Sequence, residues 1–188
     1  MPKSNNIEIL DQSTLIDDLL ARYESELGEN LVPYRGHLLR VLTYAVHFLG
    51  GDKTHLHEME VALVYHDLGV WAANTLNYLE PSIELALKDN VSNNWGHNPE
   101  LLKNIILWHH KITPFRGKNE DVINAIRKAD WVDASNGLIR KGLSKEIIAQ
   151  VKAAIPSKGF HASLKTIGIE VAGSRMNAFR DLLKVLKL

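Results

Sequence analysis

Ionisable side chains stand at the ends of apolar helical stripes in this chain, and they constrain the fold more than any other feature. In one stripe, Met59 and Leu63 lead at helical spacing to His66, and Asp67 follows Leu63 by four residues. The residues placed in this way are His37, His66, Asp67, His109 and Asp130. An isolated buried carboxylate is unfavourable unless it is paired or bound to a metal. We therefore expect the fold to gather these groups in its core.

The sequence offers histidines, but no obvious buried Lys or Arg, as partners for these acids. A divalent metal ion held by imidazoles and carboxylates is the simplest way to satisfy all of them. This ligand chemistry suits Mn, Fe, Co, Ni, Zn or Mg, and the sequence does not choose among them.

Composition excludes several other classes of protein. The 188 residues are 45% hydrophobic and 23% charged, which is typical of one soluble globular domain. No apolar run approaches the ~20 residues that span a bilayer, and the first residues lack the hydrophobic segment of a signal peptide. Cysteine is absent, which excludes disulfides and thiolate metal sites. We expect a cytoplasmic protein without a membrane partner.

Charge is unevenly distributed although the net charge is zero. Residues 1–133 carry 12 Lys and Arg against 19 Asp and Glu, and residues 134–188 carry the balancing positive charge. We expect the basic part to fold back onto the acidic part. No glycine-aromatic motif or basic run favours a nucleic-acid partner. The oligomeric state stays open, a homo-oligomer included.

Helical periodicity runs through nearly the whole chain, and no strand alternation extends beyond a few residues. Capping residues and prolines predict where the helices begin, and glycines such as Gly28 and Gly69 predict where they end. The predicted starts are Asp11, Pro33, Thr54, Pro81, Asn98, Asn119 and Ser144, and a last helix is predicted over residues 166–187. The fold class is therefore all-α, as a single domain over residues 1–188.

The order and spacing of the ligand-type residues resemble a known family. His37 is followed after 29 residues by the pair His66-Asp67, and Asp130 comes 63 residues after Asp67. The local contexts Tyr-Arg-Gly-His, Tyr-His-Asp-Leu-Gly and Lys-Ala-Asp agree with this pattern. Together they resemble the HD superfamily, whose members are all-helical and mostly metal-dependent phosphohydrolases. The resemblance covers about residues 30–135 and implies an HD-type helical bundle with a metal site in its core. Residues 136–188 add nothing to the resemblance, and we expect their helices to pack on this bundle.

The resemblance also implies roles for individual residues. His37, His66, Asp67 and Asp130 would bind one metal ion. In dinuclear relatives a paired-His segment, here His109-His110, holds a second ion. His97 is a further candidate for this second ion, but on one regular helix it would lie ~18 Å from His109.

Basic residues near these ligands are candidates for substrate contacts. Lys111 and Arg116 follow the paired histidines and would stabilise an anionic substrate, while His109 or His110 would serve as general acid. Arg40, three residues after His37, either contacts a phosphate or lies on the surface. Asp133 shares a helix face with Asp130 and is either a second-shell residue or the true ligand.

We expect a metal-dependent phosphohydrolase that uses metal-activated water on a nucleotide or another small anionic phosphate ester. Two enzymatic alternatives use the same ligands: a dinuclear-iron oxygenase and a hydratase acting on a small non-phosphate substrate. A non-catalytic HD module that binds a nucleotide or a partner is the third hypothesis. The departures from familiar HD subfamilies after Asp67 and after His110 leave the substrate open.

Overall fold

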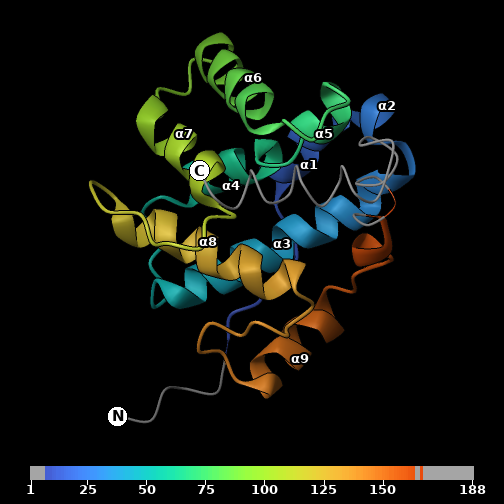
Figure 1. The fold of residues 1–188 in the computed structure, drawn as a ribbon, viewed down its shortest axis with the longest axis vertical. Helices are drawn as coiled ribbons and strands as arrows, with labels where there is room; N and C mark the ends of the chain where they lie inside the picture. Colours follow the sequence, from blue (N-terminus) through green and yellow to red (C-terminus); the bar gives the residue numbers. More distant parts are fainter. Residues whose placement is uncertain (1–6, 164–165, 167–188) are drawn as a thin grey trace.

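The computed structural model describes residues 7–163 and residue 166, and the regular structure of this described part is entirely helical (Figure 1). This confirms the predicted fold class. The helices are α1 (Thr14–Ala21), α2 (Glu24–Leu27), the 3-10 turn η1 (Gly28–Asn30), α3 (Leu31–Phe48), α4 (Leu56–Tyr65), α5 (Gly69–Ala72), α6 (Leu79–Ser92), α7 (Pro99–Trp108), α8 (Glu120–Ala134) and α9 (Lys145–Ala154). The last predicted helix, over residues 166–187, lies almost wholly outside the described residues. None of the described helices is long and apolar enough to cross a membrane.

Helix α3 is the centre of the fold. All of its residues from Pro33 to Val46 are buried except Arg35, because other helices cover it on several sides. Helix α8 packs along α3, and α4 packs against both α3 and α7. In Figure 1, α6 and α7 lie on one side of the α3–α8 pair and α9 lies on the other. One apolar core joins residues from Ile7 to Phe160.

Several helix starts follow the predicted capping chemistry. The Asn98 side chain accepts a hydrogen bond from the Glu100 amide, and the Ser144 hydroxyl accepts one from the Ile147 amide. At the first helix the cap is Ser13 instead of the predicted Asp11, and α4 begins after His55 instead of Thr54. Capping residues one or two positions apart compete for the same amides, so the sequence placed these helices but not their first residues.

Gly69 was predicted to end a helix, but it begins α5. Helix α4 has already ended at Tyr65. A Cβ atom at position 69 would lie 2.5 Å from the Tyr78 carbonyl oxygen and 2.8 Å from the Ser82 hydroxyl. Glycine is therefore required by the close approach of α5 to the start of α6.

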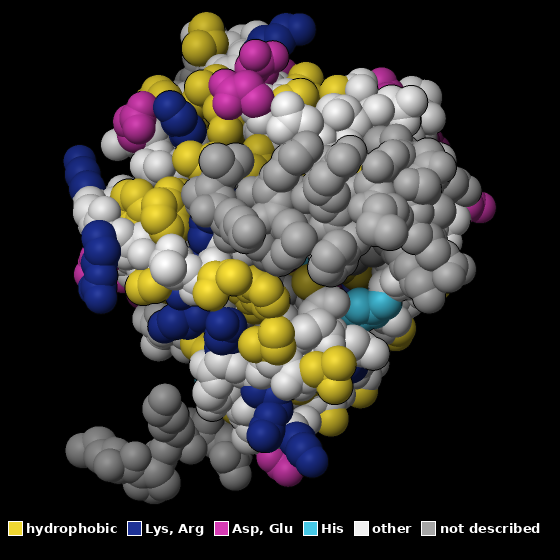
Figure 2. Space-filling model, viewed as in Figure 1, with side chains coloured by type: hydrophobic (Ala, Val, Ile, Leu, Met, Phe, Trp, Pro, Cys, Tyr) yellow, Lys and Arg dark blue, Asp and Glu magenta, His cyan; other side chains and the backbone are white. Residues whose placement is uncertain are grey.

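Within the basic part of the chain, the described residues 134–163 pack against the preceding helices, and α9 does so through apolar contacts. Helix α9 packs against α3 and buries Ile147, Ile148 and Val151. Among the described residues, no ion pair joins residues 134–163 to the acidic side chains of the preceding part. Figure 2 shows Lys and Arg side chains over α8, α9 and the chain between them. Burial of apolar surface, and not ion pairing, therefore contributes to holding residues 134–163 in place.

Candidate metal centre

Four helices bring the predicted ligands together. His37 comes from the middle of α3 and Asp130 from α8. His66 and Asp67 directly follow the last residue of α4, and His109-His110 follow the last residue of α7. Consecutive residues on a regular helix point ~100° apart. Because both helices end just before these pairs, both members of each pair turn toward the same place.

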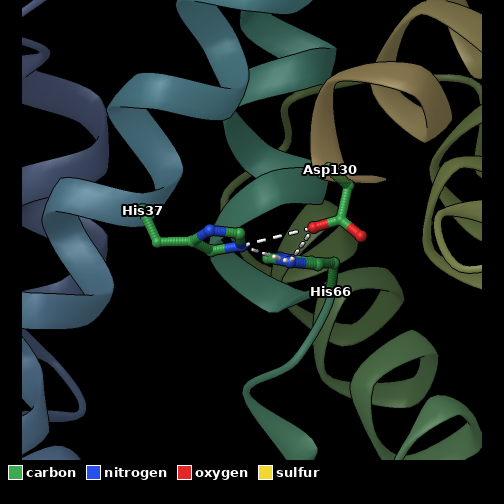
Figure 3. Close-up of side chains that lie close together, drawn as sticks. All are labelled: His37, His66 and Asp130. Atoms are coloured by element: carbon green, nitrogen blue, oxygen red, sulfur yellow. Dashed lines mark hydrogen bonds and ion pairs between the residues drawn. The ribbon is translucent and has the colours of Figure 1, made fainter. Parts of the chain in front are cut away.

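The first group of ligand atoms comes from His37, His66 and Asp130 (Figure 3). The two Nε2 atoms of His37 and His66 lie 3.2 Å apart. The Asp130 Oδ1 atom lies 3.4 Å from Nε2 of His37 and 3.9 Å from Nε2 of His66. All three side chains are buried, with at most 1% of their surface exposed.

The second group adds the paired histidines. The Asp67 Oδ2 atom lies 3.2 Å from His66 Nε2, whereas its Oδ1 atom lies 3.3 Å from His109 Nε2 and 3.9 Å from His110 Nε2. The Asp130 Oδ2 atom lies 2.8 Å from His110 Nδ1. Each carboxylate thus turns one oxygen to the first group and the other to the second. The two groups of donor atoms could therefore hold a metal ion each.

Hydrogen bonds on the outer side of the rings fix how the histidines face the centre. Nδ1 of His37 lies 2.8 Å from an Asp133 carboxylate oxygen, Nδ1 of His66 lies 2.6 Å from the Leu63 carbonyl, and Nδ1 of His109 lies 2.5 Å from the Ile106 carbonyl. Carboxylates and carbonyls accept, so each Nδ1 donates its proton outward. In the neutral rings, Nε2 then carries a lone pair directed into the centre, as metal-binding histidines do.

A cation fits this donor set. With Nδ1 of each ring directed outward, the Nε2 atoms of His37 and His66 lie only 3.2 Å apart, so two lone pairs would meet there unless a proton or a metal ion lies between them. Oδ1 of Asp67 and both carboxylate oxygens of Asp130 are buried and accept no hydrogen bond of good geometry from the described residues. Buried carboxylates without donors are unfavourable unless a positive charge compensates them. A divalent ion between these atoms would satisfy both conditions.

The pKa values show how the centre is charged when no metal occupies it. Burial opposes a charge on His66, but the carboxylates of Asp67 and Asp130 outweigh it and raise its pKa to about 9. Burial lowers the pKa of His109 to about 4, and the nearby His110 contributes to this. For Asp130, burial is outweighed by His110 and His37, which hold its pKa below the usual range. A proton on His66 thus stands where a metal ion would place its charge.

Arg40 neither contacts the centre nor lies on the surface, so both of the interpretations considered from the sequence are wrong. Its side chain is fully buried. Its Nε and Nη2 atoms donate to the Asp133 carboxylate at 2.6 and 2.9 Å, and Nη1 donates to the carbonyls of Ile155 and Pro156, each at 3.3 Å. Asp133 in turn accepts from His37 and does not belong to the groups of donor atoms that could hold an ion. Arg40 therefore fixes the position of Asp133, which in turn orients the ring of His37.

The remaining predicted site residues lie at different places. Lys111 is buried, and its carbonyl accepts a hydrogen bond from Arg127. Arg116 is 81% exposed and lies 4.0 Å from Glu120. His97 contacts His57, 2.7 Å away, instead of the paired histidines. The structure thus brings His109 and His110 to the centre, but not His97.

Three aromatic residues at the centre were not anticipated. The Tyr34 hydroxyl donates to the Val64 carbonyl at 3.0 Å and lies 3.3 Å from His66 Nδ1. The Tyr78 hydroxyl lies 3.5 Å from His109 Nε2, and the Phe160 ring stacks on His37 with centroids 4.2 Å apart. Tyr34 lies one helical turn before His37, a spacing that could have identified it. Tyr78 and Phe160 lie outside any helical stripe that ends in a ligand, so no pattern marks them.

Burial and nearby charge keep the Tyr78 hydroxyl protonated. Burial is the larger cause and the Asp67 carboxylate the next, and together they raise the pKa of Tyr78 well above its usual value. The centre therefore has a neutral hydroxyl donor beside His109.

A comparison of the chain with protein-family models, with curated proteins and with solved structures found no match.

Proposed function

We propose that this protein is a metal-dependent phosphohydrolase of the HD type, acting on a small anionic phosphate ester such as a nucleotide. One observation carries the proposal: three buried histidines with outward-bound Nδ1 protons direct their Nε2 atoms at two buried carboxylates. This combination of nitrogen and oxygen donors suits Mn, Fe, Co, Ni, Zn or Mg.

The two groups of donors assign the ligands. His37, His66, Asp67 and Asp130 would hold a first ion. Asp67 and Asp130 turn their other oxygens toward the paired histidines, His109 and His110, which would hold a second. Few protein ligands per ion leave positions for water and a substrate oxygen, as catalytic sites require.

Bound metal would supply a hydroxide at neutral pH and would polarise the phosphoryl oxygen. Side chains of the protein would bind the substrate and transfer the proton to the leaving group. Tyr78, held protonated by burial, donates a hydrogen bond to an anionic oxygen of the substrate. Where only the first ion is bound, His110 would protonate the leaving oxygen and regain a proton from solvent, because it is the most exposed member of the centre, with 20% of its side chain accessible.

The exposure of the centre also gives the direction from which substrate approaches. Solvent does not reach His37, His66 or His109, which are buried in the core. The side of the centre that solvent and substrate can reach is therefore the side of His110. The segment that follows His110 carries Arg116, whose exposed guanidinium would meet an anionic group beyond the scissile phosphate.

A dinuclear-iron oxygenase is the second candidate. The observation that favours it is the division of the Asp67 oxygens between His66 and His109, which would bridge two irons. Metal content separates the candidates: two irons per chain with oxygen consumption favour the oxygenase, whereas phosphate release with other divalent metals favours the hydrolase.

The direct test is a panel of phosphate esters assayed for phosphate release with each of the six metals in turn. We expect turnover of at least one ester, and we expect His66→Ala to lower it at least a hundredfold. His55→Ala, a partly exposed histidine outside the centre, is the matched control and should retain full turnover. Activity that survives His66→Ala would not belong to this centre, and the absence of turnover on every ester would contradict the proposal.

A further inference from the structure

A second gathering of metal-binding side chains lies away from the centre. Nδ1 of His57 is 2.7 Å from Nε2 of His97. The Glu58 Oε1 atom lies 3.7 Å from the other ring nitrogen of His97 and 3.7 Å from Nδ1 of His55. Two of the nine histidines of the chain, His55 and His97, thus lie near one carboxylate, and His57 contacts His97.

The position of this cluster relates it to the centre. His57 is in the first turn of α4, and His97 comes just before the start of α7. The two helices pack against each other, and their last residues lead into His66 and His109. They therefore run in the same direction, with the cluster at their starts and the centre at their ends. A ten-residue helix is ~15 Å long, so the two places are clearly separate.

His97 is held firmly in place. The buried Asn90 side chain accepts from the His97 amide at 3.1 Å and donates to the His97 carbonyl at 3.0 Å. Gly96 precedes it with φ of 69°, which a residue with a side chain rarely adopts. Burial is the larger influence on the His97 ring and lowers its pKa. The ring is therefore neutral at physiological pH and offers a lone pair.

We propose that His57 and His97 form a second, independent site for a borderline divalent ion such as Ni²⁺, Zn²⁺ or Cu²⁺. His57 binds through Nδ1 and His97 through Nε2, and water fills the remaining positions. Nδ1 of His97 then faces the Glu58 carboxylate 3.7 Å away, and a carboxylate on this side of the ring commonly orients a metal-bound histidine. Metal–nitrogen bonds of ~2.1 Å require the two nitrogens to be ~3.4 Å apart at a tetrahedral angle. The exposed His57 ring reaches this by moving less than an ångström outward.

An ion here would cross-link the starts of the two helices whose ends hold the centre. Binding to the folded protein alone stabilises it in proportion to the logarithm of free ion concentration. The melting temperature should therefore rise with added Ni²⁺ in any variant that keeps both histidines.

Trp95 provides a reporter for the test. Its ring lies 6.2 Å from that of His57 and 6.0 Å from that of His97, close enough for bound Ni²⁺ to quench its fluorescence. The experiment is a Ni²⁺ titration of the full chain, in which the quenching that Trp95→Phe abolishes is the signal of this site. We expect His57→Ala and His97→Ala each to weaken Ni²⁺ binding more than tenfold, and Glu58→Gln to weaken it about tenfold.

His55→Ala is the matched control, because His55 lies near the Glu58 carboxylate but is not a ligand of the proposed ion. It should bind Ni²⁺ as the unaltered protein does. Circular dichroism of each variant verifies that the helices are intact. The proposal is overturned if Trp95 quenching persists in His97→Ala, or if His55→Ala weakens binding as much as His57→Ala does.

Discussion

The two ends of the α4–α7 helix pair carry the same kinds of side chain in opposite environments. At the ends of the helices, His66 and His109 are fully buried and have their outer nitrogens fixed by carbonyls. At the starts, His57 is exposed and its partner His97 is partly so. Buried carboxylates and imidazoles without enough donors require a cation, whereas exposed ones are solvated without it. Burial, more than residue type, therefore separates a centre whose carboxylates require a compensating positive charge from a cluster whose side chains water can solvate.

The largest effect on stability should come from the support behind the centre. Arg40→Met would leave the buried Asp133 carboxylate without its guanidinium, and two carbonyls without their donor. Breaking a buried pair in this way is expected to lower the free energy of unfolding by about 3–5 kcal/mol. Urea denaturation measures it.

Arg35→Met is the matched control for this substitution. Arg35 pairs with Asp17 at the surface, where both side chains are partly exposed. Such pairs contribute about 1 kcal/mol or less. An equal loss in the two variants would contradict a buried supporting role for Arg40.

The pH dependence of stability should differ between the metal-free and the metal-loaded protein. In the metal-free protein the pKa of His66 is about 9, against 6.5 when unfolded. Its contribution to stability is fully present below pH 6.5 and is lost as the pH rises through 9, because the unfolded ring releases its proton first. At about 1.4 kcal/mol for each pH unit between the two values, the loss is roughly 3 kcal/mol.

Bound metal replaces this proton, so the loaded protein should not show the loss. Urea denaturation at pH 6.5 and pH 9.5, with and without metal, gives the comparison. Identical pH dependence in both forms would show that no metal binds at His66.

Metal binding should depend strongly on Asp130. Asp130→Asn keeps the shape of the side chain but removes the charge that faces both groups of histidines. We expect at least a hundredfold weaker binding of the first ion, which corresponds to about 2.7 kcal/mol. Equilibrium dialysis measures it, and Asp121→Asn, an exposed acid on the same helix, should bind metal normally.

The smallest effect should come from the aromatic ring that packs on His37. Phe160→Leu retains apolar volume but loses the stacked ring, which is worth about 1 kcal/mol. Metal affinity should fall about fivefold. Phe115→Leu, whose ring contacts Trp108 instead, is the control and should leave metal affinity unchanged.

The sequence predicted the helical fold and the gathering of the central residues for one physical reason. A helix has a fixed period, so an ionisable residue in phase with an apolar stripe, such as His66 or Asp130, must face the core. The helix starts at Asn98 and Ser144 were also predicted correctly, because capping depends only on residues close in the sequence. These predictions needed no knowledge of which helices become neighbours.

Predictions failed where the answer depends on neighbours distant in sequence. The Arg40 guanidinium donates hydrogen bonds to Asp133, which lies 93 residues away in the sequence. The Phe160 ring stacks on His37 from a part of the chain that carries no ligand-type pattern. His97 has the right chemistry for a ligand, but Asn90 anchors it at the other end of α7. Periodicity identifies which face is buried, but not what it is buried against.

A crystal of the metal-loaded protein, with anomalous scattering recorded at the edge of the bound metal, tests the central assignment most directly. The account predicts a peak within about 2.0–2.2 Å of the Nε2 atoms of His37 and His66 and of an Asp130 oxygen. A protein that takes up metal but shows no peak between these side chains would contradict it.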